Sequence, residues 1–277
     1  MTDDPFDNPD AGIQFDDWGR YKLPNPQTGQ WHSWTRCTTF ARSIADSFAL
    51  SQWSQRMTAK GLSMRPDLVQ LAAALDVSAD KDLLNRLVEQ AKDAAGAKVA
   101  ADTGTAIHTF AEETDAGNMS IDAVPKAHRS GVVAYREALR AAGMTVRPDL
   151  QERAVCVPLY GVAGRLDKVV READGAHAIG DVKSGKNPSL SALEIAIQLA
   201  IYAHGLNGAG VWDLSAERWE DPGVRVRTDY AVVMHMPAGK GVCALHKVDI
   251  EAGWEAAQLC WDVRERRKIK GLFTPYK

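Results

Sequence analysis

The sequence has few cysteines and no long apolar segment. Its 277 residues include four cysteines, none of them in a C-x-x-C pair. Scattered cysteines of this kind are typical of a reduced protein without a disulfide framework. No run of 18 apolar residues is present, so no transmembrane helix is expected, and the N-terminus lacks the charged-then-apolar pattern of a secretory signal. These absences predict a cytoplasmic protein with no membrane partner.

The chain also lacks a strong net charge. Its formal net charge is −3 at pH 7, so no global basic field would attract nucleic acid. The two ends nevertheless differ in charge. The first 17 residues contain six aspartates and no Lys or Arg, which predicts a solvated, poorly ordered tail. The last 17 residues are basic, which indicates either a solvated helix face or a contact with a polyanion.

Hydrophobic periodicity predicts three regions. Residues 1–35 are rich in Asp, Pro and Gly and contain several aromatic residues, so they predict a loop-rich acidic and aromatic arm. Residues 36–100 predict a helical region packed on the core. Residues 101–277 predict the core itself, with a basic helix at its end. Helices are expected over 38–57, 81–102, 103–114 and 126–143.

Within the core, short Val- and Ile-rich segments separated by turn residues predict strands. These segments cover 145–159, 161–170 and 176–185, with a hairpin turn over 171–176. An apolar helix is expected over 190–206, then a hairpin over 228–250 and a closing helix over 252–271. The order predicts an α/β fold with a mixed central sheet flanked by helices.

The stretch GDVKSGKN, residues 180–187, has two possible interpretations. The first is a phosphate-binding P-loop, but Asn187 stands where that motif needs a hydroxyl that ligates Mg²⁺. Pro188 then disfavours a helical conformation at Asn187, where the helix of a P-loop would already be running. A P-loop nucleotide-binding protein is therefore a remote alternative.

The second interpretation is a metal-dependent hydrolase. In an extended strand Asp181 and Lys183 point to the same face, and Asp167 ends the segment GVAGRLD one strand earlier. Neighbouring strands can bring the two carboxylates together, and a divalent cation between them removes their repulsion. Hard oxygen ligands favour Mg²⁺ or Mn²⁺. Lys183 is then a candidate to orient or deprotonate water, or to stabilise charge on a phosphate.

With further motifs, this pattern resembles the PD-(D/E)xK nuclease superfamily, and within it the RecB-like exonucleases, which include phage-encoded members. The similarity covers about residues 100–205 and depends on five segments in order. They are GTAIHTFAEE with His108, QERAV with Glu152, GVAGRLD with Asp167, DVKSGK with Asp181 and Lys183, and QLAIY with Gln198 and Tyr202. The resemblance implies a restriction-endonuclease-like core with a helical N-terminal region.

The resemblance also implies a role for each matched residue. His108, Asp167 and Asp181 would ligate Mg²⁺ or Mn²⁺ together with the backbone carbonyl of Val182. Asp167, Asp181 and Lys183 would form the catalytic group. Glu112 follows His108 by one helical turn and is expected to be its hydrogen-bond partner. The residues expected to contact DNA or to support the site are Gln198, Tyr202, Glu152, Glu112 and Lys186.

Some RecB-like nucleases hold an iron–sulfur cluster on one early and three clustered late cysteines. Here Cys37 is early, but Cys156, Cys243 and Cys260 are widely separated, so no cluster is expected.

The sequence therefore predicts a metal-dependent DNA exonuclease that acts in phage or bacterial DNA recombination, repair or replication. The expected substrate is a linear DNA end, including a single-stranded one, and the expected partners are a helicase or a recombinase. For a phage-encoded chain, the compartment would be the cytoplasm of the bacterial host. An endonuclease of the same superfamily and a non-catalytic DNA-binding protein are the alternatives.

Overall fold

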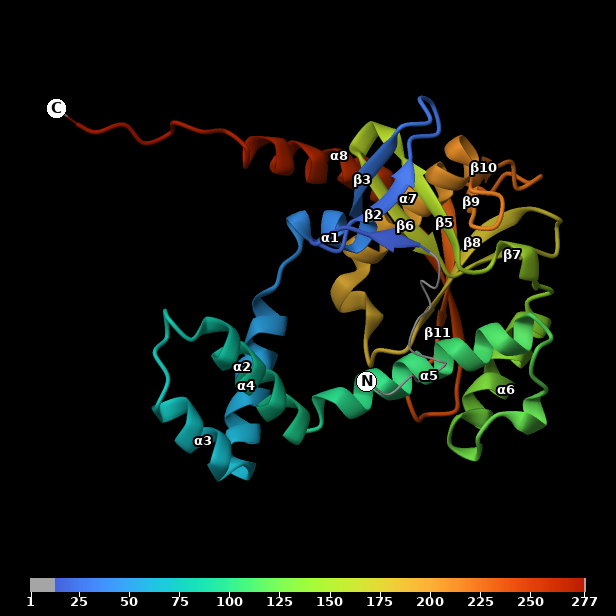
Figure 1. Cartoon of the computed structure of the whole chain (residues 1–277). Helices are drawn as coiled ribbons and strands as arrows, with labels where there is room; N and C mark the ends of the chain where they lie inside the picture. The colour runs from blue at the N-terminus through green and yellow to red at the C-terminus, as the bar shows by residue number, and fades with distance from the viewer. Residues whose placement is uncertain (1–12, 277) are drawn as a thin grey trace. The chain divides into compact units, whose positions relative to one another are not determined.

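The computed structural model describes residues 13–276, apart from the side chains of residues 99–101. Of these, residues 13–45 and 107–276 form one compact unit, and Asp46–Ala106 form a second. The described chain is mixed α/β, with eight α-helices and two mixed sheets of seven and five strands (Figure 1). Most of the expected acidic tail, including Asp3, Asp4, Asp7 and Asp10, lies outside the described residues.

The unit formed by Asp46–Ala106 is helical. It contains α2 (Phe48–Met64), α3 (Pro66–Ala73), α4 (Lys81–Ala94) and the first turns of α5 (Ala97–Asp115). Leu68, Leu87 and Ala91 form its small core. The helix expected over 38–57 is divided: α1 (Cys37–Ala41) and a 3₁₀ turn precede α2. The two helices expected over 81–102 and 103–114 instead meet at residues 95–96, and α5 continues through Thr103 and Gly104.

Residues 13–35 differ from the loop-rich arm expected from composition. They form β1 (Gln14–Phe15), β2 (Tyr21–Pro24) and most of β3 (Trp31–Arg36). The Trp34 side chain is 1% exposed, and its indole Nε1 donates to the carbonyl oxygen of Leu23 at 2.8 Å. Burial of large aromatic side chains stabilises these short strands, because aromatic residues combine strand propensity with a large apolar area. Apart from Pro24, which ends β2, the Asp, Pro and Gly residues of this segment lie outside the strands.

Two sheets replace the single central sheet that the sequence predicts. The seven-stranded sheet has the order β1-β2-β3-β6-β5-β9-β10, and the five-stranded sheet has the order β12-β11-β8-β7-β4. Each sheet has one parallel pair, β3 with β6 and β8 with β11. The remaining strands are β4 (Thr145–Arg147), β5 (Arg153–Val157), β6 (Val162–Leu166), β7 (Lys168–Arg171), β8 (His177–Lys183), β9 (Val211–Asp213), β10 (Arg218–Glu220), β11 (Tyr230–His235) and β12 (Ala244–Asp249).

The chain passes from one sheet to the other at Asp167. β6 and β7 are consecutive, and Asp167 is the one residue between them. Its carbonyl oxygen accepts a hydrogen bond from the backbone N–H of Glu152 at 3.0 Å, next to β5. Directly after it, Lys168 pairs with Gly180 of β8. The segment 161–170 was expected to be one strand, but it forms two strands that are separated by Asp167, a predicted site residue.

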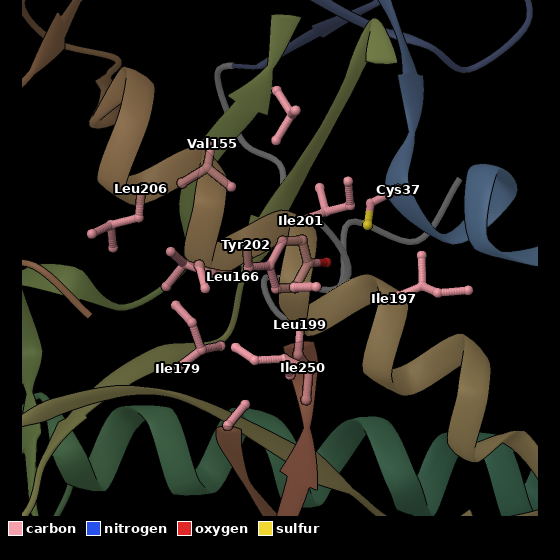
Figure 2. Packing of buried hydrophobic residues seen from close by; sticks show 14 of the residues in the cluster. Cys37, Val155, Leu166, Ile179, Ile197, Leu199, Ile201, Tyr202, Leu206 and Ile250 are labelled. Carbon is pink, nitrogen blue, oxygen red and sulfur yellow. The ribbon is translucent and has the colours of Figure 1, made fainter. Parts of the chain in front are cut away.

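Helix α7 (Ala192–Ala209) lies at the centre of the larger unit. Its side chains are buried on nearly every side, as is typical of a helix that is apolar all round. It packs against α8 (Ile250–Arg266) and strand β5. Figure 2 shows this core around α7, and the labelled side chains are Cys37, Val155, Leu166, Ile179, Ile197, Leu199, Ile201, Tyr202, Leu206 and Ile250.

The five-stranded sheet is covered on both faces. Ile179 of β8 belongs to the core shared with α7 and α8, whereas Val182 belongs to the core shared with α5 and α6 (Lys126–Ala141). Because side chains alternate along a strand, Asp181 lies on the face of Ile179. By the same alternation, Lys168 lies on the face of Val170, which packs toward α5 and α6.

One segment, Pro188–Ala209, is long and apolar enough to cross a membrane by length and composition alone. Core helices of soluble proteins pass the same test, and 56% of this window is buried inside the protein. Its apolar character is explained by the central position of α7. The segment is therefore weak evidence for a membrane span.

Gly253 determines how closely α8 approaches α7. A Cβ at this position would lie 2.3 Å from the carbonyl oxygen of Ala196, so the helices must separate to admit it. We expect Gly253→Ala to lower the free energy of unfolding by about 1–3 kcal/mol, measured by urea denaturation. Gly208→Ala is the matched control on α7, since nothing lies within 4 Å of its added Cβ. An equal loss in both variants would contradict this account of the α7–α8 contact.

Candidate active site

Helix α5 presents a row of polar side chains to the sheet. His108, Glu112 and Asp115 follow one another at intervals of four and three residues, which places them on one face of the helix. The apolar residues Ile107 and Ala111 pack beside them in the core. Partly buried polar groups on a core-facing helix need partners, and each of these three has a charged group of the same unit nearby.

His108 lies beside Asp167, at the junction of the two sheets. Its Nδ1 is 3.6 Å from Oδ2 of Asp167, and the same oxygen accepts a hydrogen bond from the backbone N–H of Val182 at 3.0 Å. Burial lowers the pKa of His108, and the Asp167 charge offsets this only in part. A neutral imidazole keeps a lone pair that can ligate a metal.

Asp181 and Lys183 form a buried ion pair on β8. Nζ of Lys183 lies 2.9 Å from Oδ1 and 2.8 Å from Oδ2 of Asp181. Only the contact with Oδ1 has hydrogen-bond geometry, so Oδ2 is buried beside a charge but without a hydrogen bond. Burial raises the pKa of Asp181 to about 7; Lys183 opposes this rise, and the charge of Asp167 adds to it. Burial disfavours the charged form of Lys183, but Asp181 and Asp167 outweigh it and raise the pKa of the amine.

Glu112 pairs with Glu152 instead of with His108. The two carboxyl groups share a hydrogen bond, which requires a proton between them. Oε2 of Glu152 also lies 2.5 Å from Nε of Arg165. Burial raises the pKa of Glu152 to about 9, the charges of Glu112 and Asp167 add to the rise, and Arg165 opposes it. The carboxylate closest to His108 is that of Asp167, which corrects the expected pairing of Glu112 with the imidazole.

The backbone conformation of Glu152 is one that the sequence pattern does not predict. Its φ angle is 51°, a left-handed conformation that is uncommon for a residue with a side chain. This conformation occurs in the turn between β4 and β5, which no periodic pattern reveals. Together with the hydrogen bond to the Asp167 carbonyl, it ties Glu152 to the point where β6 ends.

A second buried ion pair was missed by the sequence interpretation. The Lys168 side chain is fully buried, with Nζ 2.7 Å from Oδ2 of Asp115 and 3.0 Å from the Tyr135 hydroxyl. That hydroxyl donates to the same oxygen of Asp115 at 2.6 Å. Burial disfavours the charged amine, but Tyr135 and Asp115 hold the pKa of Lys168 above its ordinary value. The sequence signal that could have revealed Asp115 is its spacing from His108, which places both residues on the same face of α5.

Gln198 and Tyr202 support the site from α7. Nε2 of Gln198 donates to the Tyr202 hydroxyl at 2.8 Å, as expected for residues one turn apart. Tyr202 is 3% exposed and packs on β6, where a Cβ on Gly164 would lie 2.7 Å from its ring. Burial raises the pKa of this tyrosine. Of the two roles considered for Tyr202, its burial favours bracing the site over touching DNA.

The group as a whole has a deficit of positive charge. The carboxylates of Glu112, Glu152, Asp167 and Asp181 lie among two cationic side chains, Arg165 and Lys183. The charge of Lys168, which is paired with Asp115, opposes the rise in the pKa of Glu112 and Asp181 only in part. The raised pKa values of Asp181 and Glu152 are the expected response of crowded, buried acids. Protons or a cation would restore the balance.

The geometry does not support the P-loop interpretation. Gly180 lies inside β8, where its missing side chain makes room for Met234 and Lys168. A P-loop would need this residue in a turn around phosphate. Lys186 is exposed in the loop that follows β8, and α7 begins only at Ala192.

The basic end of the chain is partly used inside the protein. Arg264 donates to Thr35 at 3.2 Å and Arg267 donates to the Ser43 carbonyl at 3.3 Å. Lys268 pairs with Glu265. These contacts favour a structural role for part of the basic segment, and Lys270 is left exposed for solvent or a polyanion.

Among the described residues, no three His, Cys, Asp or Glu side chains are already arranged around a single point as metal ligands. What the structure does bring together is His108 with Asp167, Asp181 with Lys183, and Glu112 with Glu152, linked by the charges that each acid exerts on its neighbours. In comparisons with known proteins, the chain matches no family model and no curated sequence.

Proposed function

We propose that the chain is a metal-dependent DNA exonuclease with a PD-(D/E)xK core of RecB-like type. One observation carries this proposal. The Asp167 carboxylate accepts a hydrogen bond from the backbone of Val182, between the paired side chains of Asp181 and Lys183, and it lies beside a neutral His108. The order of the five sequence motifs supports it. The mixed α/β architecture agrees with it, since Asp167 directly precedes β7, which pairs with the strand β8 that carries Asp181.

The residues suit a hard divalent cation. His108, Asp167 and Asp181 would hold Mg²⁺ or Mn²⁺, with the Val182 carbonyl as a further ligand. Two observations support the fit: Oδ2 of Asp181 is buried without a hydrogen bond, and burial and neighbouring acids raise the pKa values of Asp181 and Glu152. A divalent cation removes both costs, since it ligates carboxylate oxygens and neutralises their repulsion.

Hydrolysis of a phosphodiester joins a water oxygen to phosphorus, breaks one P–O ester bond and delivers a proton to the leaving oxygen. When bound, the cation supplies Lewis-acid polarisation of the phosphoryl group and activation of water. Lys183 supplies an ammonium, because its raised pKa keeps it charged at neutral pH. Its side chain is 26% exposed, so Nζ can contact a phosphate oxygen and stabilise the charge that develops there.

The other residues orient this group. Asp181 fixes the position of the Lys183 amine through two short contacts. The backbone N–H of Val182 fixes the carboxylate of Asp167. The pair formed by Gln198 and Tyr202 packs against β6 just before Asp167, so it supports the strand end that positions this acid.

The proposed substrate is a linear DNA end in phage or bacterial recombination, repair or replication, with a helicase or recombinase as partner and the cytoplasm as compartment. The direct test is digestion of linear single- and double-stranded DNA with Mg²⁺ or Mn²⁺, beside a covalently closed circle. Release of mononucleotides or short oligonucleotides from the linear DNA alone supports an exonuclease. Cleavage of the circle would favour an endonuclease, and no cleavage of any DNA would reject the proposal.

Metal binding can be tested without catalysis. We expect Mg²⁺ or Mn²⁺ at about 100 times its dissociation constant to stabilise the wild type by roughly 2.7 kcal/mol. For a unit of this size, that corresponds to a rise of about 5–10 °C in Tm. Asp181→Asn should abolish most of the rise in Tm, because the uncharged amide offers no negative charge to the cation.

Asp149→Asn serves as the control for this titration, because the Asp149 side chain is exposed and already paired with Arg147. Its response to the metal should match that of the wild type. If neither metal changes the Tm of the wild type, or if the Tm of Asp181→Asn rises equally, Asp181 is not a ligand of the metal.

A further inference from the structure

A mostly apolar pocket of about 340 Å³ lies on the α7 side of the five-stranded sheet. Its floor is formed by β11 and β12, and its rim by the loop between β8 and α7. No Asp or Glu lines the pocket, so its walls do not repel a ligand that carries a negatively charged phosphate beside the bound group. The lining residues are Asn187, Pro188, Ser189, Ala192, Ile195, Val233, His235, His246 and Val248.

Strand register places this pocket next to the candidate active site. β8 and β11 are parallel, and Val233 pairs with Asp181 while His235 pairs with Lys183. Register partners in neighbouring strands share a face of the sheet. The pocket therefore begins one strand away, about 4.8 Å, from the acid and the amine of the proposed catalytic group.

The walls of the pocket are fixed by hydrogen bonds. Nε2 of His235 contacts the carbonyl oxygen of Gly185 at 2.7 Å, and the backbone N–H of Met236 donates to the carbonyl of Lys183 at 2.8 Å. The side chain of Asn187 accepts from the backbone N–H of Ser189 at 3.1 Å. The loop that carries Lys186 is thus tied to β11 in a defined conformation.

The pocket has the size and chemistry of a nucleobase site. Its volume is at the lower end of small-molecule sites, its walls are aliphatic, and two imidazole rings stand at its edge with centroids 5.9 Å apart. Flat rings and aliphatic walls bind the face of a base without regard to sequence. The Nδ2 group of Asn187 can donate to a base edge, while its Oδ1 accepts from the Ser189 hydroxyl at 2.5 Å.

We propose that this pocket receives one unstacked nucleobase of a single-stranded DNA end, the base that flanks the phosphate presented to Lys183. The inference rests on the proposed function and adds the substrate class: a paired, stacked base cannot enter such a pocket, so single-stranded ends are the preferred substrate.

The test uses 12-nucleotide single-stranded DNA in which one abasic residue is placed at each position in turn. In the presence of Mg²⁺ or Mn²⁺, one position flanking the cut should lower kcat/KM by roughly 5- to 100-fold, the effect of losing one stacked base. In EDTA, where nothing is cleaved, the same substitution should weaken binding measured by fluorescence anisotropy by a similar factor.

Two variants connect this effect to the pocket. Ala192→Trp fills it from the exposed first residue of α7, and His246→Ala removes one ring from its edge. On intact DNA, both variants should show the lowered affinity and kcat/KM that the wild type shows on the abasic strand. Placing an abasic residue in the DNA should then lower these values in the variants by less than about twofold. Ala192→Ser and His32→Ala, an exposed histidine on β3, are the controls and should behave as the wild type.

The outcomes separate this inference from the proposed function. Cleavage without a position-dependent abasic effect, or an abasic effect that persists in Ala192→Trp, overturns the pocket and leaves the nuclease intact. Position-dependent binding in EDTA that Ala192→Trp abolishes, in a protein that cuts no DNA, supports the pocket and rejects the nuclease. A preference for blunt duplex ends over single strands also overturns it.

Discussion

Lys183→Ala is expected to lower the rate of DNA cleavage by about 10²–10⁴-fold, the usual contribution of a positioned acid–base or charge-stabilising group. The variant loses the only amine that contacts Asp181 among the described residues. Without it, no ammonium stands beside the proposed metal ligands to stabilise the phosphate in the transition state. The measurement is the initial rate on linear DNA with Mg²⁺ or Mn²⁺, at saturating and at limiting substrate.

The fold should survive this change. Asp181 already has a pKa of about 7, so the orphaned carboxyl can take up a proton instead of remaining as a buried charge. Lys22→Ala, at an exposed lysine on β2 outside the site, is the matched control and should keep most of the activity. Undiminished cleavage by Lys183→Ala in a folded protein would remove this residue from the mechanism.

Asp115→Ala is expected to cause the largest loss of stability, about 3–5 kcal/mol, because it leaves the buried ammonium of Lys168 without a counter-charge. Lys168 is 0% exposed, so water cannot replace the lost carboxylate, and the Tyr135 hydroxyl also loses its acceptor. For a unit of this size, Tm should fall by about 6–20 °C. Thermal and urea denaturation of the full chain measure both quantities.

An exposed ion pair gives the comparison for Asp115. Asp149 pairs with Arg147 at 2.6 Å, but its side chain is 57% exposed, so Asp149→Ala should cost at most about 1 kcal/mol. Combining Asp115→Ala with Lys168→Met should recover part of the lost stability, since no buried charge then remains. A loss below about 1 kcal/mol in Asp115→Ala would show that Lys168 is not held by this carboxylate.

Local patterns were sufficient for the elements whose partners are close in sequence. The apolar segment 190–206 predicted α7, which begins and ends within three residues of that range. The turn over 171–176 and the hairpin over 228–250 also form, as β7 with β8 and β11 with β12. In each case the signal is a periodicity or a turn residue contained in the segment itself.

Elements that depend on distant partners were not predictable in this way. β3 is stabilised by β6, which lies more than 120 residues later, and nothing within the turn-rich segment 13–35 reveals that pairing. The same is true of Glu152, whose partners Glu112 and Arg165 come from a helix and a strand on either side of it. Lys168 resembled an ordinary strand residue until Asp115 and Tyr135 were seen beside it.

The sequence by itself determined helix α7, the hairpins β7–β8 and β11–β12, and the neighbourhood of Asp167 and Asp181, because consecutive antiparallel strands bring such positions together. Only the tertiary structure decided that the chain changes sheets at Asp167, that Glu112 meets Glu152 and not His108, and that a pocket adjoins Lys183. The physical reason is that these features depend on burial and on charges from segments far apart in the chain, which local propensity does not encode.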